Sequence, residues 1–159
     1  MLLPNSRQRT SSPPIVLVIE NHDDTRLMLK IFLETQGCRV AEAINGEQVL
    51  ELFENDKPNL VLPNLVLTET VLPGLDGLAV VSKLRRFDAF ADVPVIFLSS
   101  RVEQALKSKA FEIGGNDFLT KPIELKSLEQ TLEKYLDKNK VKSGKCPDDN
   151  FSLNRGLYS

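Results

Sequence analysis

The chain has 159 residues, of which 42% are hydrophobic and 26% charged, and its formal net charge is −2. This length allows one domain with a well-filled core, and so small a charge gives no electrostatic reason to expect nucleic acid or an anionic membrane as a partner. The sequence has neither an apolar stretch of about 18 residues that could span a bilayer nor a charged leader before an apolar run, which predicts a cytoplasmic protein.

The two ends of the sequence differ in composition from its middle. Residues 5–14 and 137–159 are mostly polar, and such segments bury too little apolar surface to offset the entropy of ordering. We therefore predict a disordered N-terminal tail at 1–14, one domain at 15–136 and a flexible C-terminal tail at 137–159. Cys38 lies within the domain and Cys146 in the tail, so we expect no disulfide and a buried, unreactive Cys38.

Apolar runs alternate with amphipathic segments throughout the domain. Residues 15–19 form a continuous apolar run that is typical of a strand buried on both faces. The helix predicted next has Asp23 or Asp24 as its N-cap and Gly37 as its C-terminal stop. Four more strand–helix pairs follow: a strand at 39–43 and a helix after Gly46, a strand ending near 68 and a helix at 77–86, a strand at 93–98 and a helix at 102–113, and a strand at 117–120 and a helix at 124–136.

This alternation predicts an α/β fold in which a doubly wound, five-stranded parallel sheet lies between two layers of helices. Parallel strands need long crossover connections, and a helix after each strand supplies them. In such sheets the functional groups gather beyond the carboxyl ends of the strands. The candidate site residues are therefore those just after the predicted strands: Glu20, Asn21, Glu69, Ser99 and Lys121.

From 15 to 136 the chain resembles a bacterial response-regulator receiver domain, which has the flavodoxin-like receiver fold. The resemblance is carried by residues 16–20, 72–77, 94–99 and 117–122, which occur in the family's order and at near-family spacing. In that family an Asp after the third strand accepts a phosphoryl group from a histidine kinase, and an acidic pair after the first strand binds magnesium. A Ser or Thr after the fourth strand and a Lys after the fifth hold the phosphoryl oxygens.

The resemblance implies a role for each candidate residue, but only Ser99 and Lys121 carry the residue type that the family uses. It places Glu69 at the phosphoacceptor position and Glu20 with Asn21 at the acidic positions. It also matches the peptide bond before Pro122 to the family's cis peptide. Phe118 matches the family's switch aromatic, although a simple core role is an equal alternative. His22 is expected to be an exposed loop residue without a catalytic role.

A tandem duplication makes the position of the third strand ambiguous. Residues 58–62 and 63–67 both read Pro-Asn-Leu-Val-Leu, which adds five residues relative to the family spacing. Asn64 instead of Glu69 would take the acceptor position if the first copy formed the strand. We favour Glu69, because Pro63 inside a central strand would remove a ladder hydrogen bond.

The residues at the predicted site suggest that phosphoryl chemistry is lost. Asn21 offers magnesium a neutral carbonyl in place of a carboxylate. The extra methylene of Glu69 moves its carboxylate outward by roughly 1 Å, which can cost on the order of 100-fold in rate. We expect no cofactor, and magnesium binding that is weak at best, through Glu20 and Glu69. We also expect the longer carboxylate to approach Lys121 and Ser99.

Our leading hypothesis is a stand-alone pseudo-receiver that is not an enzyme and acts by binding another protein through its 102–136 face. The partner would be a signalling protein: a histidine kinase, a phosphotransfer protein or a downstream effector. A homodimer is a possible assembly. One alternative is a phosphorylatable receiver with residual magnesium-dependent transfer to Glu69. A second is a small nucleotide- or flavin-binding enzyme, against which no Gly-rich phosphate loop follows Ile19.

Overall fold

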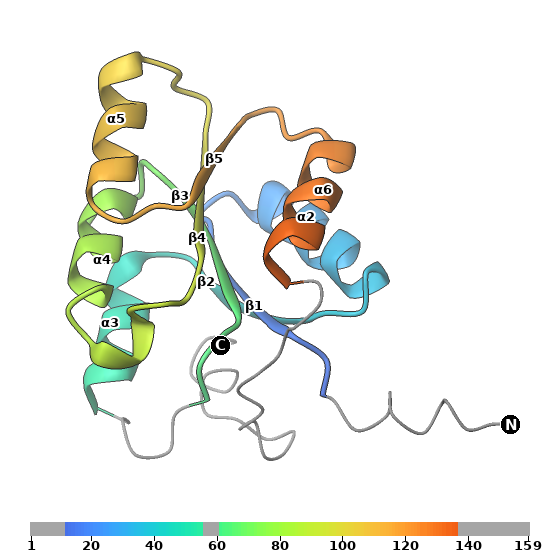
Figure 1. The fold of residues 1–159 in the computed structure, drawn as a ribbon, viewed down its shortest axis with the longest axis horizontal. Helices are drawn as coiled ribbons and strands as arrows, with labels where there is room; N and C mark the ends of the chain where they lie inside the picture. The colour runs from blue at the N-terminus through green and yellow to red at the C-terminus, as the bar shows by residue number, and fades with distance from the viewer. Residues whose placement is uncertain (1–11, 56–60, 137–159) are drawn as a thin grey trace, which may run out of the picture.

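Five parallel strands form one sheet at the centre of the computed structural model, which describes residues 12–55 and 61–136 (Figure 1). The strands are β1 (Ile15–Ile19), β2 (Arg39–Ala43), β3 (Leu65–Glu69), β4 (Val95–Ser99) and β5 (Asp117–Thr120). Their order in the sheet is β2-β1-β3-β4-β5, so the strand order reverses between β1 and β3. The predicted doubly wound α/β fold is confirmed. Residues 1–11 and 137–159, which hold nearly all of the two predicted tails, lie outside the described residues.

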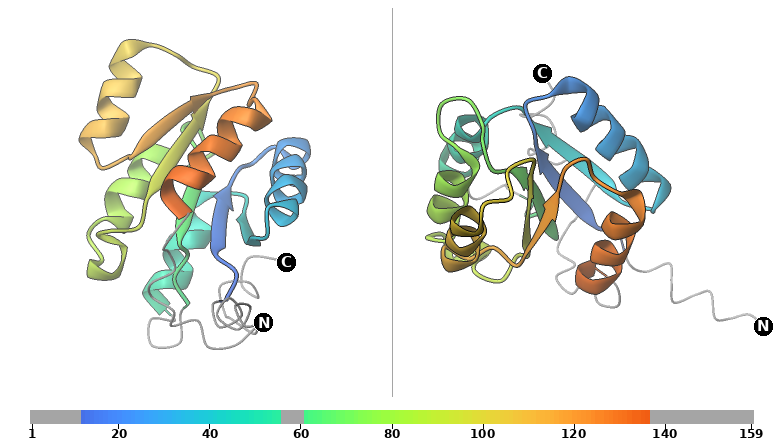
Figure 2. Two further views of the ribbon diagram at one scale, coloured as in Figure 1. Left: turned by 45° about the vertical axis from the view of Figure 1, so that its right-hand side comes forward. Right: turned by 90° about the horizontal axis from the view of Figure 1, so that it is seen from above.

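Helices cover both faces of this sheet, as the view from above shows (Figure 2). The helices are α2 (Asp23–Thr35), α3 (Gly46–Asn55), α4 (Gly77–Leu84), α5 (Gln104–Glu112) and α6 (Leu125–Leu136). α2 and α6 lie on one face, whereas α3, α4 and α5 lie on the other. None of the helices within the described ranges is both long and apolar enough to cross a bilayer.

The continuous apolar run of β1 is explained by these two helical layers. Successive side chains of a strand point to opposite faces of the sheet. Ile15, Leu17 and Ile19 pack with α3 and α4, whereas Val16 and Val18 pack with α2 and α6. Each residue of β1 is almost completely buried. Both faces of the central strand therefore need apolar side chains, which is why no polar residue interrupts it.

The boundaries of four elements differ from the predicted ones, by up to two residues at either end. α4 ends at Leu84 instead of 86, β4 begins at Val95 instead of 93 and ends at Ser99, α5 covers Gln104–Glu112, and α6 begins at Leu125. A short 3-10 helix, η2 (Asp88–Phe90), was not predicted. Terminal turns are held by few hydrogen bonds, so sequence patterns locate them poorly.

The predicted cap of α2 is wrong, because neither Asp23 nor Asp24 precedes the helix. His22 is the N-cap residue: its backbone is extended, its carbonyl oxygen accepts from the Arg26 N–H at 2.9 Å, and its side chain makes no capping hydrogen bond. Both Asp residues instead lie in the first turn, where a negative charge interacts favourably with the helix dipole. Gly37 follows the helix with a φ of 89°, in agreement with its predicted role as the C-terminal stop.

The second copy of the duplicated sequence forms β3. Asn64, just before the strand, pairs with Ile15: its backbone N–H donates to the Ile15 carbonyl oxygen and its Oδ1 accepts from the Ile15 N–H, both at 2.8 Å. Pro63 lies outside the strand, as the preferred register requires. Residues 58–60 of the first copy lie outside the described residues. This register puts Glu69 at the carboxyl end of β3, directly beside the point where the strand order reverses.

Candidate functional site

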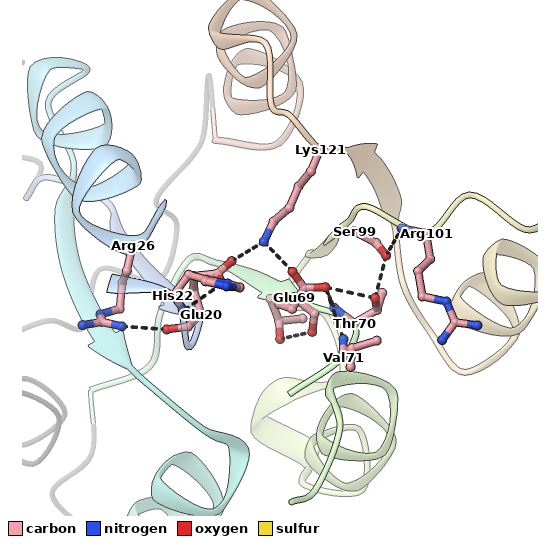
Figure 3. Close-up of polar contacts among 10 residues, drawn as sticks. Glu20, His22, Arg26, Glu69, Thr70, Val71, Ser99, Arg101 and Lys121 are labelled. Atoms are coloured by element: carbon pink, nitrogen blue, oxygen red, sulfur yellow. Dashed lines mark hydrogen bonds and ion pairs between the residues drawn. The ribbon is translucent and has the colours of Figure 1, made fainter. Parts of the chain in front are cut away.

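Four of the predicted site residues meet at the carboxyl edge of the sheet (Figure 3). Glu20 follows β1, Glu69 is the last residue of β3, Ser99 is the last residue of β4, and Lys121 follows β5. Parallel strands all end at the same edge, so these residues converge although as many as 101 positions separate them in the sequence. Asn21 is exposed.

The ammonium group of Lys121 bridges the two carboxylates. Its Nζ donates to Glu20 Oε1 at 2.8 Å and to Glu69 Oε1 at 2.5 Å. Glu20 is fully buried and Glu69 is 7% exposed, so this ion triad is held away from bulk water. Burial lowers the pKa of the Lys121 ammonium, but the hydrogen bonds and negative charges of Glu20 and Glu69 outweigh that effect and raise it above its ordinary value. Lys121 is therefore protonated at neutral pH.

The second oxygen of Glu69 is held by the chain that follows it. Oε2 accepts from the backbone N–H of Thr70 at 3.0 Å and of Val71 at 3.2 Å, and the Thr70 hydroxyl lies 3.2 Å away. With Lys121 on Oε1, the Glu69 carboxylate has nitrogen donors on both of its oxygens. These charge-assisted hydrogen bonds fix the position of the Glu69 carboxylate.

Ser99 reaches this carboxylate through Thr70, which sequence reasoning missed. The Oγ atoms of Ser99 and Thr70 lie 2.7 Å apart, and Ser99 Oγ accepts from the Arg101 N–H at 3.0 Å. The hydroxyl of Thr70 therefore stands between Ser99 and Glu69, whereas a direct approach was predicted. A Thr directly after a strand gives no recognisable signal in one sequence, because its partner comes from the next strand.

Glu20 is held by neighbours on α2 and in the loop before it. Its Oε2 accepts from the His22 N–H at 3.1 Å, and its carbonyl oxygen accepts from Arg26 Nη1 at 2.9 Å. The imidazole Nδ1 of His22 lies 3.5 Å from Oε2, while the His22 side chain is 71% exposed, as expected of a loop residue. Arg26, six positions after Glu20, was not predicted to contribute to the site. Its contact ties the first turn of α2 to Glu20.

Phe118 lies in β5, partly buried against the core. The Lys107 Nζ on α5 lies 5.5 Å from the centre of its ring, a distance suitable for a cation–π contact. Packing against the core fits the structural reading of Phe118, and its predicted role as a switch aromatic stays a prediction. The bond between Lys121 and Pro122 is cis, as the resemblance implied.

The residues present do not fit the magnesium ion that the resemblance implies. Magnesium favours several oxygen ligands in nearly ideal octahedral geometry. Here the two carboxylates share the Lys121 ammonium, and the remaining oxygen of each accepts backbone N–H groups. Among the residues that the structure describes, no three His, Cys, Asp or Glu side chains gather where they could hold a metal ion. The ammonium group of Lys121 already occupies the space between the two carboxylates.

The raised pKa of Lys121 predicts how the triad responds to pH. Because the pKa is higher in the folded than in the unfolded chain, the stabilisation is fully present below the ordinary lysine pKa of about 10.4 and is lost as the pH rises through the folded value. We expect the difference in unfolding free energy between the wild type and Lys121→Met to stay constant from pH 7 to about pH 10 and to narrow above it. Urea titrations at stepped pH measure this; a difference that already narrows between pH 7 and about pH 9 would contradict it.

Comparisons with known proteins agree with this geometry. The family model "Response regulator receiver domain" matches residues 16–133. The transcriptional regulatory protein AfsQ1 of Streptomyces coelicolor is 32% identical over 130 residues, which cover 82% of this chain and 54% of AfsQ1. An uncharacterised 14.6 kDa protein of Leptolyngbya boryana is 29% identical over 76% of this chain and 88% of its own length. The chain thus spans about half of the first relative and most of the second.

Solved structures show the same arrangement of strands and helices. A two-component response regulator from Clostridium difficile has 26% sequence identity and a TM-score of 0.69, covering 79% of this chain and 97% of the other. The chemotaxis protein CheY4 of Vibrio cholerae, at 20% identity, shares the fold with a TM-score of 0.71 over 79% of this chain and the whole of its own. With its fold, four of its predicted site residues at one edge and a family match over most of its length, the chain belongs to the response regulator receiver domains of two-component signal transduction.

Proposed function

We propose that this receiver domain signals without being phosphorylated, because the Glu69 carboxylate permanently fills the place of a phosphoryl oxygen. The observation that carries the proposal is the set of contacts around Glu69. Lys121 donates to one of its oxygens, and the Thr70 and Val71 N–H groups donate to the other. By resemblance, a lysine at this position contacts the phosphoryl group of the active receiver; here its partner is a side chain of the same protein.

The same contacts argue against residual phosphoryl transfer to Glu69. Attack on a phosphodonor needs a carboxylate oxygen that can turn toward it, yet Lys121 holds one oxygen of Glu69 and backbone N–H groups hold the other. Transfer also needs a divalent cation to neutralise the charge that develops, and Lys121 already bonds to both Glu20 and Glu69. Each defect alone slows the reaction, and both act on the same step.

The output of such a domain is a binding surface, and we propose that it acts by binding and not as an enzyme. The 102–136 face contains α5, β5 and α6, and three large apolar side chains stand out from this region: Val102 is 56% exposed, Phe111 47% and Leu125 44%. These exposed apolar side chains support a protein-binding role for this region. The partner we propose is a cytoplasmic signalling protein, namely a histidine kinase, a phosphotransfer protein or an effector, with a second copy of this chain as the alternative.

The wild-type chain should therefore keep its intact mass after incubation with acetyl phosphate and Mg²⁺. We expect no gain of a phosphoryl group, because hydrogen bonds hold both oxygens of the Glu69 carboxylate and the pocket does not fit magnesium. Intact-mass spectrometry measures this directly, with an ordinary receiver domain in the same mixture as the positive control. A stoichiometric gain in the wild type that disappears in Glu69→Gln would instead establish transfer to Glu69 and overturn the proposal.

A further inference from the structure

We propose that Thr70 is the positioning residue through which the Glu69 carboxylate controls Ser99 and the segment that leads into α5. This inference rests on the proposed function, since it names the route by which the fixed charge acts on the rest of the domain. Three contacts carry it: Thr70 Oγ1 lies 3.2 Å from Glu69 Oε2 and 2.7 Å from Ser99 Oγ, and Ser99 Oγ accepts from the Arg101 N–H at 3.0 Å. Figure 3 shows them as a continuous chain between Glu69 and Arg101.

The protons in this chain have one arrangement that satisfies every contact. Arg101 N–H can only donate, and the ionised Glu69 carboxylate can only accept. Each hydroxyl has a single proton. Thr70 must therefore donate to Glu69, which leaves Ser99 to donate to Thr70 and to accept from Arg101. All four groups then have partners, and the hydrogen bonds point the same way, toward the negative charge, so that each polarises the next.

Burial makes this arrangement obligatory. Thr70 is 1% exposed and Ser99 is fully buried, so neither hydroxyl can exchange its partner for bulk water. A buried hydroxyl left without a partner costs free energy, roughly 1–3 kcal/mol. The positions follow from the sheet: Glu69 pairs with Leu98 across β3 and β4, and the Thr70 N–H donates to the Leu98 carbonyl oxygen at 3.1 Å. This register places Thr70 beside Ser99.

The same series of contacts also reaches the backbone of Lys121. The Lys121 N–H donates to the Ser99 carbonyl oxygen at 2.8 Å, while the Lys121 ammonium donates to Glu69. One carboxylate thus fixes the side chain of Lys121 directly and its backbone through Thr70 and Ser99. Arg101 lies just before α5, and Lys121 lies just after β5, so both ends of the route lead into the 102–136 face.

The test uses the backbone amide of Arg101 as the reporter in ¹H–¹⁵N spectra of the full chain. We expect Glu69→Gln to displace the Arg101 resonance in the wild-type background and in Thr70→Ser, which keeps the hydroxyl. In Thr70→Val, which has the same shape without the hydroxyl, we expect the displacement to fall below about a third of the wild-type value. The remainder is the through-space effect of removing the charge. If Thr70 had only a structural role, Thr70→Val would shift the Arg101 resonance, but the displacement caused by Glu69→Gln would keep its wild-type size.

Ser99→Ala interrupts the same route at the next link and serves if Thr70→Val does not fold. We expect the same loss of dependence there. A displacement in Thr70→Val or Ser99→Ala that matches the wild type, or no displacement of Arg101 by Glu69→Gln at all, would overturn the role of Thr70. The two proposals can fail separately. A phosphoryl gain in the wild type refutes the proposed function, whatever the Arg101 resonance shows. An unchanged mass, together with an Arg101 displacement that does not depend on Thr70, refutes only this route.

Discussion

The double variant Asn21→Asp, Glu69→Asp is expected to gain one phosphoryl group per chain from acetyl phosphate and Mg²⁺, where the wild type gains none. Shortening residue 69 by one methylene withdraws its carboxylate from Lys121 and leaves space for a phosphoryl group between them. The Asp at 21 offers magnesium an anionic carboxylate in place of the neutral carbonyl of Asn21. Intact-mass spectrometry measures the gain, and loss of the signal on removing Mg²⁺ identifies the reaction as metal-dependent.

Two matched variants make this result interpretable. Asn21→Asp with Glu69→Gln has the same additional carboxylate but no acceptor, so it should gain no mass. Glu69→Asp alone keeps the neutral Asn21, and we expect it to react more slowly than the double variant, by roughly tenfold or more, because positioning of the metal limits the transfer. If the double variant remained unmodified, some feature other than residues 21 and 69 would be responsible for the loss of reactivity.

Lys121→Met is expected to lower the free energy of unfolding by about 3–5 kcal/mol at pH 7. The cause is not the net strength of the ion triad, since forming it requires three charges to leave water. Removing the ammonium leaves Glu20 and Glu69 buried next to each other with two uncompensated negative charges. Urea denaturation monitored by circular dichroism measures the change, because the transition midpoint moves with little change in slope.

The control is Lys126→Met, which makes the same chemical change on the exposed side of α6. We expect it to change stability by no more than about 0.5 kcal/mol. In a Glu20→Gln, Glu69→Gln background the buried charges are gone, so Lys121→Met should cost less than half of its wild-type effect. Equal costs at positions 121 and 126 would show that the triad is not held away from water as the structure describes.

Much of the site was predictable because it follows from strand order and strand ends. The buried run of β1 fixed the centre of the sheet, and parallel pairing then required Glu20, Glu69, Ser99 and Lys121 to lie at one edge. The duplicated segment was resolved by a single physical constraint, the missing N–H of Pro63. Such inferences succeed because they depend on backbone rules that hold wherever the same elements occur.

The parts that were not predictable depend on contacts between elements. Thr70 contacts Ser99 only because of the register in which β3 and β4 pair. No pattern in the sequence near residue 70 indicates a partner 29 positions away. The role of Arg26 likewise depends on the angle at which α2 leaves β1. The capping preference of Asp was outweighed at α2, where the helix begins one residue earlier and the backbone of His22 supplies the first carbonyl.

The span of the ion triad along the chain has a consequence for folding kinetics. Lys121, which follows β5, binds Glu20 after β1 and Glu69 at the end of β3. Its contact with Glu20 brings together groups 101 positions apart in the sequence. Contacts of such long range cost the most loop-closure entropy, so they form after the local β–α units have assembled. Interactions that are absent from the transition state act on the unfolding rate and leave the folding rate nearly unchanged. We therefore expect Lys121→Met to speed the unfolding of the domain and to leave its folding rate nearly unchanged.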